Sequence, residues 1–180
     1  VGMSVMLARG NAADPVAAEK AARAFTYESL FKLGNDPILR GEQAAQAASK
    51  VAAIPAVREI LLKFQQDFAA NPPDGKPGTV LDGRDIGTVI CPQAPVKIYV
   101  TASDEVRAQR RFKELQGRAE NVTYATVLNE LKERDARDAN RSTAPAKPAS
   151  DAVILDTSNM TADQAFAEAL KIAEAKLKQS

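Results

Sequence analysis

The sequence contains no histidine and no tryptophan, and it has a single cysteine, Cys91. The lack of histidine excludes histidine-dependent catalytic triads, histidine general bases and histidine-ligated zinc. One cysteine allows neither an intrachain disulfide nor a thiolate metal cluster, so a reducing compartment, the cytoplasm, is expected. We interpret Cys91 as a small core residue in preference to a reactive thiol.

Aromatic residues make up only 5% of the chain, so alanine, valine and leucine must fill most of its core. The formal net charge of +1 argues against the broad positive field of a dedicated nucleic-acid binder. No apolar run approaches the roughly 20 residues of a membrane span, and no signal peptide is visible. At 180 residues, one domain with room for a lid or small lobe is expected.

The first half of the chain is predicted to be helical. Asp14 is a candidate N-cap for an alanine-rich helix that begins at Pro15 and runs to about Phe25. Two further helices are expected over about 41–53 and 56–69.

Short apolar runs alternate with helical segments in the second half. The runs are residues 79–81, 96–100 and 153–155. They are almost entirely apolar, as strands buried on both faces should be. Helices are predicted over about 104–116, after Ser103, and 124–140, after Thr123, and a capping box at Thr161 opens a last helix. This alternation predicts an α/β fold with a parallel sheet flanked by helices.

The most informative stretch is T-V-L-D-G-R-D-I-G, residues 79–87. Its apolar run ends in Asp82, turns on Gly83, and presents Arg84 and Asp85 side by side. Ligands of α/β proteins gather beyond the carboxyl ends of the strands. A cation and an anion held there suit a ligand with both a phosphate and a hydrogen-bonding base, although a solvated ion pair on a turn would explain the motif as well.

Arginine is concentrated in one region, because seven of the twelve arginines lie between residues 107 and 141. On helices they would form two stripes with members three and four residues apart, each on one face. The stripes are Arg107, Arg110 and Arg111, then Arg134, Arg137, Asp138 and Arg141. Arginine is a planar, permanently charged fork that grips phosphate oxygens bidentately. Phosphate binding is therefore indicated, with solvated ion pairs within each helix as the alternative.

Four segments together resemble the bacterial cytidylate kinases. In chain order they are Q-A-A-S-K-V-A-A-I-P-A-V-R-E, L-D-G-R-D-I-G-T-V, P-V-K-I-Y-V-T-A-S and E-R-D-A-R-D-A-N-R. The resemblance runs from about residue 43 to the C-terminus. It implies one nucleoside monophosphate kinase domain over 1–180, of the P-loop NTPase type. Within it, a helical nucleotide-binding lobe would cover about 26–75 and a helical lid about 107–141.

The resemblance implies transfer of the γ-phosphate of ATP to CMP or dCMP with Mg²⁺ present. For CMP, it assigns the base to Arg58 and Asp85, the phosphate to Arg84 and Arg141, and the sugar to Arg134, Asp138 and Ser49. It assigns the ATP phosphates to the lid residues Arg110, Arg111 and Arg137. Catalysis would fall to Arg84, Arg141 and Arg110. No side chain is expected to bind the metal directly, although Asp82 is placed either to orient the Mg²⁺ shell or to support the phosphate loop.

Simpler readings of three of these assignments remain open. Ser49 is also the kind of small residue that lets two helices approach. Arg58 could pair with a carboxylate on its own helix, and the lid arginines could be structural.

The family opens with a strand, a phosphate loop G-x-x-x-x-G-K-[ST] and then D-[ST]-G-x-x-Y-R, and neither pattern occurs in these 180 residues. We therefore expect the natural protein to carry them ahead of Val1, and the sheet here to lack its first strand. Without the phosphate loop, the 180-residue chain as given is expected to be inactive, and an inert CMP-binding chain is one alternative to a kinase. A polyanion-binding module is another, although few aromatics accompany the arginines. We expect a monomer with neither nucleic-acid nor membrane partners.

Overall fold

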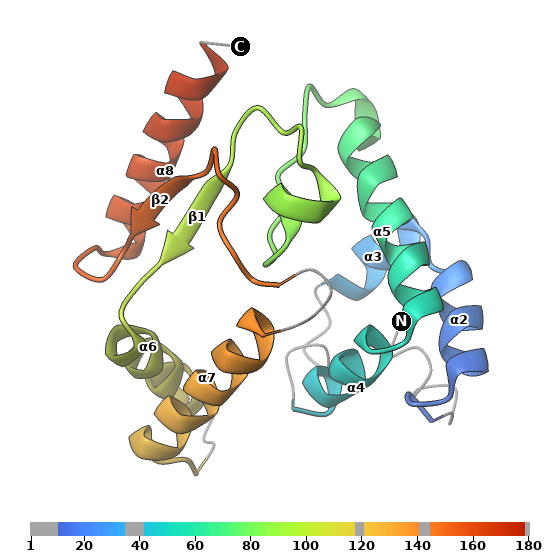
Figure 1. Cartoon of the computed structure of the whole chain (residues 1–180), viewed down its shortest axis with the longest axis horizontal. Coiled ribbons are helices and arrows are strands. Elements are labelled where there is room, and N and C mark those ends of the chain that lie inside the picture. Colours follow the sequence, from blue (N-terminus) through green and yellow to red (C-terminus); the bar gives the residue numbers. More distant parts are fainter. Residues whose placement is uncertain (1–10, 35–41, 118–120, 141–144, 179–180) are drawn as a thin grey trace. The chain divides into compact units, whose positions relative to one another are not determined.

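The computed structural model describes residues 11–34, 42–117, 121–140 and 145–178 (Figure 1). The chain divides into two compact units, Val1–Thr79 and Val80–Ser180. Each unit has a hydrophobic cluster of its own, and the two are described in turn.

The described part of the first unit is helical. Its α-helices are α2 (Pro15–Arg23), α3 (Tyr27–Gly34), α4 (Glu42–Ala52) and α5 (Pro55–Ala70), followed by a 3₁₀ turn at Pro73–Gly75. Asp14 caps α2 as predicted, because its carboxylate accepts a hydrogen bond from the Val16 amide at 3.0 Å. The helices predicted over 41–53 and 56–69 are also confirmed, whereas α3 was not predicted.

Small side chains build the core of this unit. Its buried members are Ala12, Ala18, Ala22, Ala47, Val51 and Val57. Because alanine adds little bulk, helices α2, α4 and α5 pack closely around Val57, which is fully buried. Four aromatic rings lie together elsewhere in the unit, with Tyr27 4.7 Å from Phe64 and 5.5 Å from Phe68, and Phe25 5.3 Å from Phe64, between ring centroids.

The described part of the second unit joins a parallel strand pair to three α-helices. Its elements are β1 (Ile98–Thr101), α6 (Asp104–Gly117), α7 (Tyr124–Ala139), β2 (Val153–Asp156) and α8 (Ala162–Leu177). β1 pairs with β2 in parallel, with Ile98 opposite Val153 and Thr101 opposite Asp156. Helix α8 packs against β2, and α6 and α7 lie side by side as a hairpin (Figure 1).

The helix starts predicted in this half are confirmed by their caps. The hydroxyl of Ser103 accepts from the Val106 amide at 3.3 Å, and that of Thr123 accepts from the Thr126 amide at 3.2 Å. The capping box of Thr161 is complete, because both of its reciprocal hydrogen bonds with Gln164 are present.

The predicted strand over 79–81 is wrong, because these residues form no strand in the structure. A strand needs a neighbour for its backbone groups, and in the described part of the chain β1 and β2 pair only with each other. Val80 is accordingly 97% exposed. An unpredicted π-helical turn follows at Ile86–Ile90, and Cys91 after it is half-buried and not in a disulfide.

Replacing Val57 by alanine should destabilise the first unit. The change removes two fully buried methyl groups and should lower the free energy of unfolding by about 2 kcal/mol. Val16→Ala is the matched control, because Val16 lies on α2 with 76% of its surface exposed. Urea unfolding should separate the two variants, and equal effects would show that Val57 does not anchor this core.

Candidate functional site

A buried ion pair joins the L-D-G-R-D segment to helix α7. The Arg84 Nε atom lies 2.5 Å from Oδ2 of Asp138, whose side chain is only 4% exposed, while that of Arg84 is 41% exposed. Asp138 belongs to the last turn of α7. The pair therefore fixes a loop residue against a helix end, while the Arg84 side chain stays partly exposed to solvent.

Local structure on both sides holds this pair in place. A Cβ added to Gly83 would lie 2.9 Å from the Ile86 side chain, so a larger residue before Arg84 would force that side chain to shift. The carbonyl of Asp85 accepts hydrogen bonds from the amides of Val89 at 2.9 Å and Ile90 at 3.2 Å, which starts the π-helical turn.

Two arginines share the single carboxylate of Asp138. The Nε atom of Arg134, one turn earlier on α7, lies 4.0 Å from the same Oδ2 atom that Arg84 contacts. Burial and then the positive charge of Arg84 lower the pKa of Arg134, against the opposing effect of Asp138. The three groups together carry an excess positive charge, which a bound anion would relieve.

A second ion-pair network holds α6 to α7. Arg107 contacts Asp104 at 2.5 Å on its own helix and Asp135 at 2.6 Å on α7. Burial alone would lower the pKa of Arg107, but hydrogen bonds and charge from Asp135 and Asp104 outweigh it, and the pKa is raised. Beneath this network lie the buried residues Ala108, Leu115 and Val127. The hairpin is therefore packed and ion-paired.

The other two arginines of the α6 stripe have different partners. Arg110 donates to the carbonyl oxygens of Thr157 at 2.7 Å and Met160 at 3.2 Å, and to the Thr157 hydroxyl at 3.1 Å. Arg111 pairs with Glu114 on α6 at 2.8 Å. The arginines predicted to share one phosphate-binding face thus contact three separate places.

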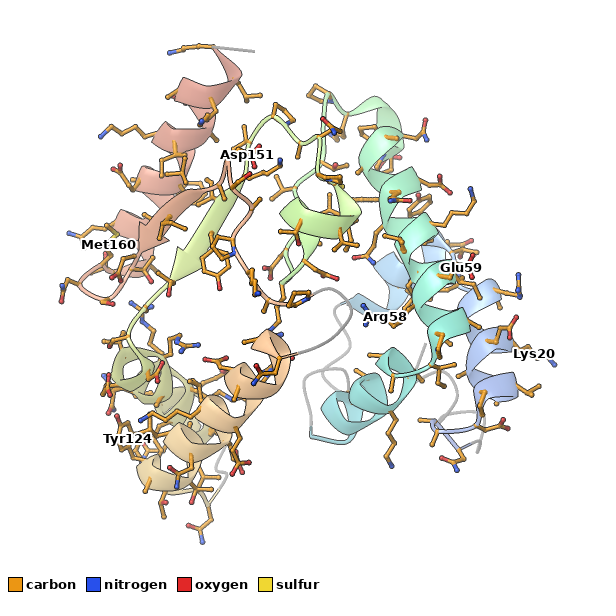
Figure 2. All side chains as sticks on the ribbon, in the orientation of Figure 1. Lys20, Arg58, Glu59, Tyr124, Asp151 and Met160 are labelled. Carbon is orange, nitrogen blue, oxygen red and sulfur yellow. The ribbon has the colours of Figure 1, made fainter. Side chains whose placement is uncertain are left out.

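The structure therefore brings together part of the predicted site. Arg84, Arg134 and Asp138 meet directly, and Asp85 and the exposed Asp82 belong to the segment that carries Arg84. In the first unit, Arg58 on α5 (Figure 2) donates to the Ala52 carbonyl at 3.4 Å. No described carboxylate lies within ion-pair distance of it. The Ser49 and Arg137 side chains and all of Arg141 lie outside the described residues.

Sequence analysis missed a buried lysine beside this segment. The side chain of Lys97 is 8% exposed, and its ammonium lies 2.6 Å from Asp151 and 2.5 Å from the Pro92 carbonyl. The hydrogen bond from Lys97 lowers the pKa of Asp151. A Cβ on Gly87 would lie 3.2 Å from the lysine stem. The sequence did contain an indication of this buried lysine, because Lys97 is the only charged residue within the apolar run P-V-K-I-Y-V.

Among the described residues, no group of three or more histidine, cysteine, aspartate or glutamate side chains could hold a metal ion. Within the same part of the chain, no helix combines the length and apolar character needed to cross a membrane.

Helices around a parallel strand pair define an α/β protein, and in it two arginines share one buried carboxylate. The chain matches the family model for cytidylate kinase over residues 16–175. It belongs to the cytidylate kinase family, which has the nucleoside monophosphate kinase fold of the P-loop NTPases. The described helices and small parallel sheet agree with that fold.

Three curated relatives carry the name cytidylate kinase. The protein of Paramagnetospirillum magneticum is 56% identical over 172 residues, which are 96% of this chain and 79% of the relative. That of Rhodospirillum rubrum is 53% identical over the same shares of both chains. That of Caulobacter sp. strain K31 is 49% identical over 97% of this chain and 77% of the relative.

Asp138→Asn should destabilise the protein and increase the stabilisation that added phosphate gives it. Neutralising the shared carboxylate leaves Arg84 and Arg134 uncompensated, at a cost of about 2 kcal/mol given that Arg84 is partly solvated. Added inorganic phosphate should then raise the thermal midpoint more than in the unmodified protein, because it replaces the lost charge.

Asp135→Asn is the matched control for this experiment. It makes the same substitution on the same helix but removes a partner of Arg107. Its thermal midpoint should fall without any enhanced response to phosphate. If phosphate stabilises both variants equally, Arg84 and Arg134 do not form an anion site.

Proposed function

We propose that this protein transfers the γ-phosphate of ATP to CMP or dCMP, giving CDP or dCDP. Its relatives, about half identical over nearly the whole chain, are named cytidylate kinase. Phosphoryl transfer asks a protein for positioning and charge stabilisation and for little covalent chemistry. A chain rich in arginine and lacking histidine suits that demand.

The observation that carries this proposal is the arrangement of Arg84 and Arg134 around Asp138. Asp138 engages the Nε side of Arg84, and the guanidinium has further N–H donors. Because Arg84 is 41% exposed, those donors can serve the CMP phosphate. Asp138, almost completely buried, orients Arg84, and this role suits its burial better than the predicted contact with the sugar. Arg134 adds positive charge from α7.

The remaining assignments stay proposals that extend this core. The cytosine ring would meet Asp85 and Arg58, and the 26–75 lobe that carries Arg58 would bind the nucleotide. The 107–141 region would act as the lid. The other proposed contacts are Ser49 and Arg134 with the sugar, Arg141 with the CMP phosphate, and Arg111 and Arg137 with the ATP phosphates. Arg84 and Arg141 would be the catalytic arginines, whereas Arg110, predicted for both roles, has its donors engaged by Thr157 and Met160.

Mg²⁺ would enter as the ATP complex, where it neutralises charge on the transferring group. Mg²⁺ is commonly held by substrate phosphates, water and one or two carboxylates. The exposed carboxylate of Asp82, two residues before Arg84, fits such a supporting place. We further propose that the protein acts as a cytoplasmic monomer.

Two alternative functions are less well supported. An inert CMP-binding chain and a polyanion-binding module would both use the same arginines. The similarity to cytidylate kinases over almost the entire chain favours a kinase over either. The net charge of +1 also gives a polyanion binder little long-range attraction.

Turnover and binding together test the proposal. With MgATP, the natural protein that carries the expected phosphate loop should form ADP and CDP from CMP, and calorimetry should show saturable CMP binding. CMP binding without turnover would support the inert chain. Binding to single-stranded nucleic acid that weakens steeply with salt, with no CMP binding, would support the polyanion module. Either result would overturn the kinase assignment.

Arg84→Lys should weaken binding of CMP but not of cytidine, which lacks the phosphate. Lysine keeps the positive charge beside Asp138 but loses the bidentate fork, so CMP affinity should fall by about 10-fold. Arg23→Lys is the control, since Arg23 is exposed and pairs with Glu19 in the first unit. Titration calorimetry with both ligands measures the effect, and equal losses for CMP and cytidine would contradict a phosphate role.

Asp85→Asn should weaken both CMP and cytidine, because the carboxylate is assigned to the base. Losing a hydrogen-bond acceptor from a base-reading site costs about 1–3 kcal/mol, or roughly 5- to 150-fold in affinity. Asp163→Asn, on the exposed first turn of α8, is the control. Unchanged cytidine affinity in the Asp85 variant would remove Asp85 from the base site.

A further inference from the structure

Arg110 is the one arginine of the α6 stripe whose described partners lie outside the α6–α7 hairpin. Arg107 and Arg111 contact carboxylates on α6 and α7. Arg110 instead reaches the loop between β2 and α8, where Figure 2 labels Met160. Its three acceptors are the Thr157 carbonyl, the Thr157 hydroxyl and the Met160 carbonyl. All three acceptors are neutral oxygens. The contact therefore consists of hydrogen bonds and is not an ion pair.

The loop that receives Arg110 is itself tied to both strands. Thr157 is 4% exposed, and both its amide, at 2.8 Å, and its hydroxyl, at 2.9 Å, donate to the carbonyl of Thr101 at the end of β1. The Ser158 hydroxyl accepts from the Ser103 amide at 2.9 Å and contacts Asp156 at the end of β2. Arg110 therefore attaches α6 to a fixed point at the carboxyl ends of the strands.

We propose that Arg110 is a positioning residue that anchors the α6–α7 hairpin to the strand ends through Thr157 and Met160. The inference rests on the proposed kinase function, because it concerns how the proposed lid is oriented. The packed and ion-paired hairpin transmits this orientation from α6 to α7, and hence to Arg134. Arg110 thus acts on the reaction through the placement of other arginines.

This role differs from a direct contact between Arg110 and the ATP phosphates. A guanidinium turned toward a phosphate would give up its hydrogen bonds to two backbone carbonyls and a buried hydroxyl. In the positioning role those bonds persist throughout the reaction. Thr157 is then as important as Arg110, although its hydroxyl would never touch ATP.

A double-mutant cycle separates these two roles. Arg110→Lys and Thr157→Val each weaken the anchor, and valine closely matches the shape of threonine. With CMP and MgATP, each variant should lower kcat by about 10-fold with KM for MgATP changed less than about 3-fold. The double variant should be no worse than the poorer single variant, because both changes break one contact. Thr157→Ser, which keeps the hydroxyl, should restore kcat.

A direct phosphate contact predicts the opposite pattern. Arg110→Lys would then raise KM for MgATP by 10-fold or more, Thr157→Val would leave both constants unchanged, and the two effects would simply add. That result would overturn the positioning role. Arg110 is an exposed residue, so Arg110→Lys is expected to fold. This variant therefore still distinguishes the positioning role from a direct phosphate contact if Thr157→Val fails to fold.

Amide hydrogen exchange tests the anchor without any turnover. Exchange over residues 107–112 of α6 should accelerate at least about 10-fold in Arg110→Lys and Thr157→Val, because local opening becomes easier. Arg111→Lys, which alters only the pair with Glu114, should leave this exchange unchanged. Unaltered exchange in the first two variants would refute the anchor. Faster exchange in a protein that neither binds CMP nor turns over would refute the proposed function alone.

Discussion

The ion pair between Arg84 and Asp138 is the interaction on which the candidate site depends. Asp138 is almost completely withdrawn from water, and a buried carboxylate is tolerated only when a cation compensates it. If the segment that carries Arg84 and Asp85 moved away from the end of α7, the buried carboxylate of Asp138 would lose its cation, at a large electrostatic cost. The same carboxylate also tempers the repulsion between Arg84 and Arg134, so one acid holds two arginines close together, as the proposed phosphate site requires.

The parts of the structure that could be predicted from the sequence are those decided by nearby residues. The caps at Asp14, Thr123 and Thr161 form because each side chain meets an amide two or three residues away. The strand predicted over 79–81 failed because an apolar run shows only that residues avoid water. The backbone of a strand also needs a neighbouring strand, and sequence pattern does not show whether one is available.

The arginine stripe on α6 also combines features that nearby residues decide with features that only tertiary contacts decide. Helical spacing correctly places Arg107, Arg110 and Arg111 within two turns, and it also allows the pairs of Arg107 with Asp104 and of Arg111 with Glu114, three residues away on α6. It does not identify Asp135 on α7 or the carbonyls of the β2–α8 loop, which come close only in the folded chain. The pairing of Arg84 with Asp138 was hidden for the same reason. The residue types indicated phosphate binding, whereas the tertiary contacts determine which partner each arginine has.

That distribution has a consequence for catalysis. Donors aimed at a developing charge help most when they are held in place before the reaction, because no reorganisation is then needed at the transition state. Arg84 is held by a buried carboxylate and Arg110 by fixed neutral oxygens. In the proposed site, Arg84 would still have N–H donors and positive charge available for a ligand. The donors of Arg110 are engaged by the β2–α8 loop, and this contact fixes the position of α6. In the proposed kinase, binding and orientation would thus fall to different arginines, and the acceptor that each one meets in the fold would decide which.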